Sequence, residues 1–220
     1  MKKHHFLKHV IQTVMLSAAL LLAAAPVHAD GGLQEDSSSK TLLQLLQNTY
    51  WQSYYGSLTL PIDANGNAVL NGIAFLKLPN APGDGTPGSI NLTISAKQPF
   101  FVPLFAEGGT SYTDGTPPDD FLDLNIYRTL VIKFTIDGET IVNSRNVMNY
   151  FSQSEFVPVI PYRFGNLDSI IWTQSVGVYN GPLSPGHHVM KLDVRNTIPA
   201  FGAISEFHNT WNITVLPKNK

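Results

Sequence analysis

The chain has 220 residues, of which 43% are hydrophobic, 14% charged and 10% aromatic, and it contains no cysteine. This composition excludes an intrinsically disordered chain, a disulfide-stabilised miniprotein and a Cys-ligated zinc site. The net charge of −2 argues against a basic nucleic-acid-binding protein, so we expect no nucleic-acid partner. With 17 glycines, 15 prolines and few charges, the composition favours an all-β protein with many turns.

Residues 1–29 have the pattern of a secretory signal peptide. Three lysines precede an apolar run over residues 14–25, and Val27 and Ala29 supply the side chains that signal peptidase accepts. We therefore expect cleavage between Ala29 and Asp30. The apolar run is shorter than the ~20 residues that span a bilayer. We therefore expect a secreted or periplasmic protein that has no integral membrane segment after cleavage.

The remaining chain divides into a polar linker, residues 30–39, and one β-sandwich domain, residues 40–220. The domain begins with a predicted amphipathic helix over residues 40–55, whose apolar side chains recur on one face. Ser39 is a suitable N-cap residue, and Gly56 is expected to end the helix. The apolar face predicts that this helix packs on a sheet.

After the helix, apolar residues follow the two-residue period of β-strands. Pro103 interrupts one run, which predicts an edge strand or a bulge there. Asp137-Gly138 between two alternating runs predicts a β-hairpin. The pattern predicts an all-β fold, a two-sheet antiparallel sandwich of the Ig-like or jelly-roll kind. The expected strand regions are residues 69–78, 90–95, 100–105, 130–136, 140–142, 156–160, 170–179, 188–194 and 207–215.

A structural turn and strand are predicted near the C-terminus. Pro185 and Gly186 favour a tight turn, and the strand that follows alternates between two faces. His188 shares the face of Met190 and of the apolar residues beyond it, whereas His187 lies on the opposite face. We therefore expect His188 to point inward as a neutral, structural histidine bonded to a carbonyl or hydroxyl, and His187 to point outward.

Four blocks stand in a fixed order along the chain: Thr49–Pro61, Ile94–Phe105, Thr135–Gly138 and Gly181–His188. They resemble the Trp-rich, Phe-Phe-x-Pro, Val-Asp-Gly and Leu-Ser-Pro-Gly-x-His blocks of a family of uncharacterised secreted proteins from bacteria and plants. The resemblance implies export and a β-sandwich, and the family has no known activity. This chain lacks the cysteines expected in family members, so the resemblance implies no disulfide.

Aromatic residues carry the main functional indication. Trp51, Tyr54 and Tyr55 crowd the end of the predicted helix, and Glu107 follows a second aromatic run. Flat rings stack on sugars or anchor protein interfaces, so these four residues are candidates for ligand binding. We expect a secreted, non-catalytic binding or structural module, with a glycan or another secreted protein as its ligand.

The alternative is a secreted hydrolase that uses carboxylates around Glu107. Glu155 and Asp168 are the acids with which Glu107 could form an acid/base pair. The sequence contains no Gly-x-Ser-x-Gly motif and no phosphate-binding loop. No catalytic residue is therefore assigned, and a non-catalytic role is favoured.

The sequence offers two groups of possible metal ligands but does not predict a metal site. His187, His188 and His208 have side chains that suit zinc or copper, but their expected directions differ. A Gly/Pro-rich loop carries four acids that offer oxygen ligands for calcium, and solvated loop acids are the favoured interpretation. We expect no cofactor. The loop acids are Asp114, Asp119, Asp120 and Asp123.

Overall fold

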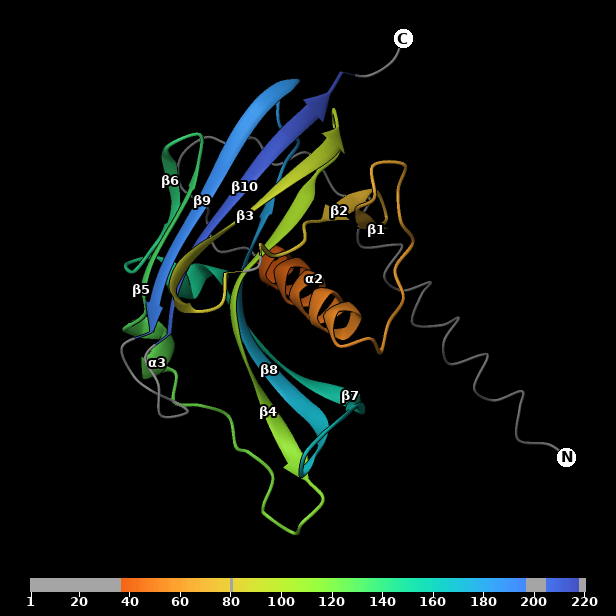
Figure 1. Ribbon diagram of the computed structural model, residues 1–220, viewed down its shortest axis with the longest axis vertical. Coiled ribbons are helices and arrows are strands. Elements are labelled where there is room, and N and C mark those ends of the chain that lie inside the picture. The colour runs from red at the N-terminus through yellow and green to blue at the C-terminus, as the bar shows by residue number, and fades with distance from the viewer. Residues whose placement is uncertain (1–36, 80, 197–204, 218–220) are drawn as a thin grey trace, which may run out of the picture. The chain divides into compact units, whose positions relative to one another are not determined.

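The computed structural model describes residues 37–79, 81–196 and 205–217. The expected signal peptide and residues 30–36 of the linker lie outside these ranges. Strands dominate the described chain (Figure 1). The elements in order are α2 (Ser37–Tyr54), β1 (Ala68–Leu70), β2 (Ile73–Phe75), β3 (Asp84–Ser95), β4 (Phe100–Tyr112), α3 (Asn125–Arg128), β5 (Val131–Ile136), β6 (Glu139–Asn143), the 3-10 helix η1 (Val147–Tyr150), β7 (Phe151–Phe164), β8 (Leu167–Asn180), β9 (Gly186–Asn196) and β10 (Ser205–Leu216).

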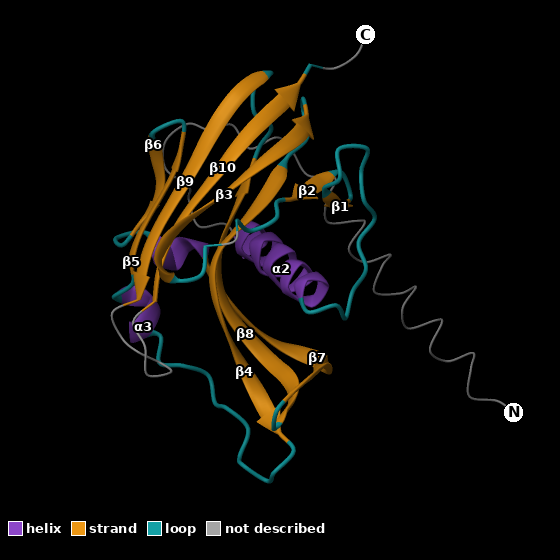
Figure 2. Ribbon diagram, viewed as in Figure 1, coloured by secondary structure: helices purple, strands orange, loops and turns teal. Residues whose placement is uncertain are grey.

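The strands form two five-stranded sheets (Figure 2). Sheet A has the order β1-β2-β4-β8-β7, and sheet B has the order β3-β10-β9-β5-β6. The predicted all-β sandwich is confirmed, but the expectation of purely antiparallel sheets is wrong. β2 pairs with β4, and β3 with β10, in parallel. Side chains alternate with the same period in both kinds of sheet, so the apolar pattern does not specify strand direction.

One hydrophobic core lies between the sheets. Trp211 on β10 is fully buried, its Nε1 donates to the carbonyl of Lys77 at 2.8 Å, and its ring meets Phe134 edge-on at 6.1 Å. Sheet A contributes Phe100, Val102, Val176 and Val178 to this core, and sheet B contributes Ile132, Phe134, Leu192, Trp211 and Ile213.

Helix α2 begins at Ser37, three residues earlier than expected, so Ser39 lies within the helix and is not its N-cap. The first four N–H groups of a helix have no backbone acceptor within it, so serine, which competes with backbone hydrogen bonds in a helix interior, costs little in this turn. At the other end Gly56 adopts a φ of 80°. Its N–H donates to Ser53 and that of Ser57 donates to Gln52, which is the Schellman pattern.

Helix α2 packs on the face of sheet A that points away from the core. Gln47 is fully buried there, its Nε2 donates to the carbonyl of Tyr150 at 2.9 Å, and its Oε1 accepts from Ser175 Oγ. Phe101 contacts the ring of Tyr50 at 5.9 Å. Polar and aromatic contacts together fix the helix on the sheet. No helix in the described ranges is long and apolar enough to cross a membrane.

Two local predictions are confirmed. β4 pairs with β8 through Pro103↔Gly177 and then Phe105↔Val176, so Leu104 is an extra residue and the strand bulges at the proline. The β5–β6 turn is built from Asp137-Gly138, with φ of 51° and 87°. Both central residues of a type I′ hairpin turn need positive φ, which Asp-Gly supplies.

Candidate functional site

The aromatic end of α2 is only partly exposed. Tyr54 is 60% exposed, and Tyr55, in the turn that follows the helix, is half-buried. Trp51 is 6% exposed, and its ring meets those of Tyr50 and Tyr54 at 5.0 and 5.3 Å, so it is not available to stack on a ligand as we expected. Tyr55 lies 5.3 Å from Tyr54, edge to face, and 6.2 Å from Trp51 between ring centroids.

Opposite this helix end, strand β7 leaves its partner. The β7–β8 pairing is interrupted between Glu155 and Ile160. The intervening Val157 is 87% exposed and Val159 is 45% exposed. β7 is an edge strand, and proline at position 158 has no N–H to offer to a further strand.

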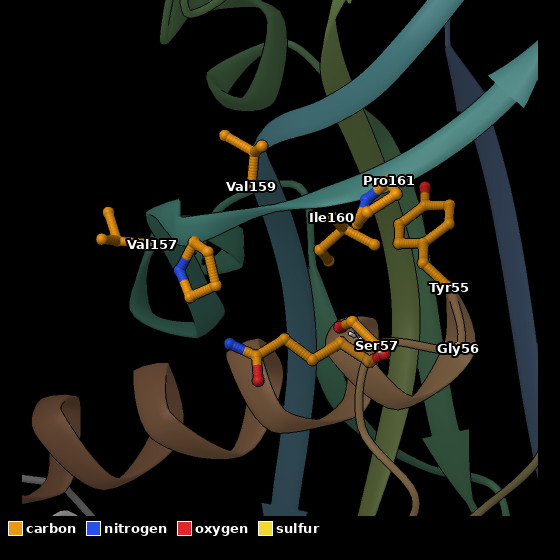
Figure 3. Close-up of a pocket in the computed structure, with 9 residues that line it drawn as sticks. Tyr55, Gly56, Ser57, Val157, Val159, Ile160 and Pro161 are labelled. Atoms are coloured by element: carbon orange, nitrogen blue, oxygen red, sulfur yellow. Dashed lines mark hydrogen bonds between the residues drawn. The ribbon is translucent and has the colours of Figure 1, made fainter. Parts of the chain in front are cut away.

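A cleft of about 590 Å³ opens between the end of α2 and this part of β7 (Figure 3). We call it the α2–β7 cleft. In Figure 3 the ring of Tyr55 lies beside Pro161, with the β7 side chains above the helix end. None of the lining residues is charged. They are Gln52, Tyr55, Gly56, Ser57, Val157, Pro158, Val159, Ile160 and Pro161.

The hydroxyl of Tyr55 is the most notable polar group of the cleft. It lies 3.6 Å from the position that a Cβ on Gly108 would occupy, so it reaches strand β4 across the sheet face. The ring also meets Tyr162 of β7 at 6.0 Å. Burial, followed by the neighbouring Tyr54 and Tyr162, raises the pKa of Tyr55 to about 12. The hydroxyl therefore stays protonated and can donate a hydrogen bond.

Glu107 does not line the cleft. It lies on β4 directly opposite Gln174 of β8, and its side chain is half-buried. Burial raises its pKa to about 7. Only its backbone carbonyl has a side-chain donor among the described residues, Thr173 Oγ1 at 3.2 Å.

The carboxylate pair of the alternative hydrolase interpretation is not brought together. Glu155 is exposed on β7 and pairs with Trp172, two residues along from Gln153, which is the β7 residue in the row of Glu107 and Gln174. Asp168 lies near the β7–β8 turn and accepts from Ser169 Oγ at 3.1 Å. Burial is the cause of the raised pKa of Glu107, with no contribution from a second described carboxylate.

His188 lies against two acceptors at the start of β9. Its side chain is 11% exposed, Nδ1 lies 2.6 Å from Oδ2 of Asp137, and Nε2 lies 2.8 Å from the carbonyl oxygen of Ser184. Burial lowers the pKa of His188, but the hydrogen bonds to Asp137 and Ser184 and the charge of Asp137 outweigh burial and raise it. Because both ring nitrogens face acceptors, this arrangement favours the protonated form of His188, contrary to our expectation of a neutral ring.

Ser184, His188 and Asp137 also have the residue types of a nucleophilic triad. Ser184 Oγ lies 3.5 Å from Nε2, a contact too long for a well-formed hydrogen bond, and Nε2 already faces a carbonyl. The following residue is Pro185, which has no N–H to stabilise an oxyanion. The arrangement holds two turns together and is not suited to acyl transfer.

The three histidines are not brought together. His187 is exposed and lies 3.3 Å from Thr214 Oγ1, whereas His208 lies between Asp193 at 2.7 Å and Glu206 at 3.1 Å. Within the described ranges, no group of three His, Asp or Glu residues is arranged to hold a metal ion.

The loop acids are used in local hydrogen bonds. Asp119 accepts from the N–H and hydroxyl of Thr110 and from the hydroxyl of Tyr112. Asp114 accepts from Asn166 Nδ2 at 2.8 Å. These bonds fix the loop against β4 and the β7–β8 turn.

The β7 side of the cleft was missed by the sequence reasoning. The segment 156–160 has the composition of an ordinary strand, so the sequence indicated only the tyrosines at the end of the helix as ligand-binding candidates. The signal that was available is the alternation of Val157 and Val159 with prolines 158 and 161, since prolines inside a strand indicate an edge with irregular pairing.

Comparisons with known proteins add little. No family model matches the chain, and no curated protein matches it. A chain from the solved structure described as PbICP-C in complex with falcipain-2 is 14% identical over 66% of this chain and 98% of that chain, with a TM-score of 0.26. A likeness of this extent carries no argument about function.

Proposed function

We propose that the protein is an exported, non-catalytic binding module that holds an uncharged glycan in the α2–β7 cleft. The observation that carries this proposal is the cleft itself, about 590 Å³ in volume and lined by apolar, aromatic and neutral polar groups. Ligand sites commonly have this size and this mixture of an apolar wall with a few polar groups.

The polar groups suit a sugar. Tyr55 supplies a ring face and a protonated hydroxyl, and Gln52 supplies a side-chain amide. The hydroxyl of Ser57 already donates to the carbonyl of Gln52 at 3.0 Å and keeps its lone pairs as acceptors. An aromatic face beside neutral donors and acceptors favours a sugar ring over a charged ligand.

A protein partner is the second candidate, and one observation favours it. Val157 is 87% exposed and Val159, two residues further along the same edge strand, is 45% exposed. Exposed apolar side chains close together are typical of interaction surfaces. Because prolines 158 and 161 remove backbone donors, such a partner would bind through side chains and not by adding a strand.

The hydrolase alternative has less support. A glycosidase needs two carboxyl groups that flank the bond to be cleaved. Glu107 is outside the cleft, and neither Glu155 nor Asp168 lies with it. We therefore propose no catalytic activity.

Export rests on the sequence of residues 1–29. The N-terminal sequence of the protein isolated from the secreted or periplasmic fraction tests it, with Asp30 as the expected first residue. Full-length chain retained in the cytoplasm would contradict the proposal.

Ligand binding is tested with a panel of neutral and acidic oligosaccharides, followed by calorimetry on any that bind. Val159→Lys places a charged side chain in the cleft, and we expect affinity to fall at least about tenfold. Val131→Lys is the matched control, since Val131 is 53% exposed on sheet B, away from the cleft. Tyr55→Phe removes only the hydroxyl and should weaken binding about three- to tenfold.

Equal loss in the two lysine variants, or binding only of acidic sugars, would contradict the glycan proposal. Binding of a protein partner that Val159→Lys abolishes, with no oligosaccharide bound, would favour the second candidate.

A further inference from the structure

We infer that the outer edge of strand β3 is a pairing surface for a second copy of this chain, and that the side chain of Asn67 closes this edge in the single molecule. β3 is the first strand of sheet B and pairs with β10 alone. An edge strand offers backbone N–H and carbonyl groups to which a strand of another chain can add. The α2–β7 cleft borders the other sheet, so pairing at β3 does not depend on the proposed function.

The pairing with β10 determines which backbone groups of β3 face outward. The two strands run parallel and stay in register from Pro87 to Ser95. Directly after β3, the N–H of Ala96 donates to the carbonyl of Leu216 on β10 at 2.8 Å. Since the backbone groups of successive strand residues point to opposite sides, every second residue before Ala96 faces away from β10. These residues are Ser95, Thr93, Asn91, Ser89 and Pro87.

Both ends of this outward row are closed. Pro87 has no N–H to offer. The N–H of Ser95 donates to Gln98 Oε1 at 3.2 Å, and the carbonyl of Ser95 accepts from the N–H of Gln98 at 3.1 Å. Within the described ranges, no partner reaches the outward backbone groups of Ser89 and Asn91. The centre of the edge would therefore be open if Thr93 were also free.

Thr93 is closed by one buried side chain. Asn67 is 2% exposed, and its Nδ2 donates to the carbonyl of Thr93 at 2.7 Å. Asp63 holds Asn67 in place, because its Oδ1 accepts from the N–H of Asn67 at 2.9 Å. Oδ2 of the same carboxylate accepts from Gln98 Nε2 at 3.3 Å. Asp63 thus orients both side chains that cover the edge, and a strand could add at Thr93 only by breaking a buried hydrogen bond.

The sequence of the edge favours a second copy as the partner. Residues 89–95 read Ser-Ile-Asn-Leu-Thr-Ile-Ser, which is nearly symmetric about Leu92. Two copies related by a two-fold axis at Leu92 would pair antiparallel and place similar, uncharged residues opposite each other. The pairs are Ser89 with Ser95, Ile90 with Ile94, Asn91 with Thr93, and Leu92 with itself.

The central pair of this dimer needs the group that Asn67 occupies. Asn91 and Thr93 both face outward, so when they stand opposite each other they can exchange two backbone hydrogen bonds. The two-fold axis repeats this pair, which gives four bonds in all. Two of the four use the carbonyl of Thr93 as acceptor, and Asn67 Nδ2 already donates to it. Removal of this side chain should therefore convert the closed edge into a self-pairing edge.

Sedimentation velocity over a range of protein concentrations tests the role of Asn67. We expect the wild type to be a monomer and Asn67→Ala to self-associate at least about tenfold more tightly. Asn65→Ala is the matched control, because Asn65 lies in the same loop but its Nδ2 donates to Ser95 Oγ, a side-chain atom, at 3.3 Å. It should sediment as the wild type does. A folded Asn67→Ala that stays monomeric, or a wild type that dimerises equally well, would overturn the inference.

A second pair of variants tests whether association occurs through β3. Asn91→Pro, added to Asn67→Ala, removes an N–H that faces away from β10 and should restore the monomer. Asn91→Ala, added in the same way, also loses the side-chain bond from Asn212 Nδ2 to Asn91 Oδ1 but keeps the N–H, so the dimer should remain. A dimer that survives Asn91→Pro would rule out β3 as the pairing edge.

Asp63→Ala provides an independent route to the open edge if Asn67→Ala does not fold. Asp63 is only half-buried, and its loss releases Asn67 from the loop. We expect this variant also to associate at least about tenfold more tightly than the wild type. Its Asn91 amide should gain protection from hydrogen exchange as protein concentration rises. A folded Asp63→Ala that is monomeric and shows no such protection would contradict the inference.

Discussion

His188 and Asp137 are joined by a hydrogen bond of 2.6 Å between Nδ1 and Oδ2, although they lie 51 residues apart. Oδ1 of Asp137 accepts in addition from the N–H of Val189 at 2.8 Å. Asp137 belongs to the β5–β6 turn and His188 to the start of β9, so this contact fastens the hairpin to the neighbouring turn. Since Nε2 of His188 also faces the carbonyl oxygen of Ser184, the surroundings favour an imidazolium paired with a carboxylate.

The first prediction concerns the stability of this pair. His188→Ala should lower the free energy of unfolding by ~1–3 kcal/mol, because it removes packing and leaves two acceptors without their donor. His187→Ala, on the exposed face of the same strand, should cost less than ~0.5 kcal/mol. Urea unfolding of the two variants measures the difference. Equal effects, or a larger one for His187→Ala, would mean that β9 has a different register.

The second prediction is the pH dependence of the same pair. The pKa of His188 is raised above its ordinary 6.5. The contribution of His188 to the free energy of unfolding is therefore complete below pH 6.5 and is lost as pH rises through the pKa of the folded state. Burial raises the pKa of Asp137, but hydrogen bonds from His188 and Val189 outweigh it and lower the pKa below the ordinary 3.8. The contribution of Asp137 is lost as pH falls through that lowered value.

The pair therefore stabilises the fold most between these limits. We expect the difference in unfolding free energy between wild type and His188→Gln to be about 0.5–1 kcal/mol larger at about pH 5.5 than at about pH 8.5. His208→Gln is the control, since His208 is bonded to acids at an exposed position and should show a smaller change. A difference that does not vary with pH would show that His188 is neutral in the folded protein.

Local features of the fold could be predicted because each depends on adjacent residues. The Asp137-Gly138 turn needs two positive φ angles that few other dipeptides supply, and the bulge at Pro103 follows from a missing N–H. The alternation of Met190 and Leu192 indicates the buried face of β9 whatever its neighbours are.

Features that depend on contacts distant in sequence could not be predicted in this way. Gln47 is a polar residue outside the apolar face of the helix, and only the presence of Tyr150 and Ser175 explains its complete burial. The charge of His188 depends on Asp137 in the same manner. The cleft likewise requires the end of α2 to meet a distorted part of β7, which no local pattern specifies.

The third prediction tests the packing of β4 on β8. A Cβ on Gly109 would lie 2.0 Å from the indole of Trp172, whose Nε1 donates to the carbonyl of Asp119 at 2.8 Å. Gly109→Ala should therefore displace Trp172 and cost about 2–4 kcal/mol. A Cβ on Gly108 would meet its neighbours at 3.5 Å or more, so Gly108→Ala should cost less than about 1 kcal/mol. Similar losses in thermal unfolding would contradict this packing.

The fourth prediction concerns Gln174, a fully buried amide at the centre of sheet A. Its Oε1 accepts from the N–H of Leu122 at 3.0 Å, and its Nε2 donates to the carbonyl of Leu122 at 3.1 Å and to Gln153 Oε1 at 3.0 Å. One side chain therefore pairs both backbone groups of a loop residue, as a neighbouring strand would. This contact fixes the loop that follows β4 over the sheet.

Gln174→Leu keeps the side-chain volume but leaves the N–H and carbonyl of Leu122 unpaired, and should cost about 2–4 kcal/mol. Gln44→Leu is the matched control, because Gln44 is exposed and its Nε2 donates to the carbonyl of Gln153 at 3.0 Å; it should cost less than about 1 kcal/mol. Hydrogen exchange separates a local from a global effect. The Leu122 amide should lose protection in Gln174→Leu while β9 keeps it. Unchanged protection at Leu122 would show that Gln174 does not hold the loop.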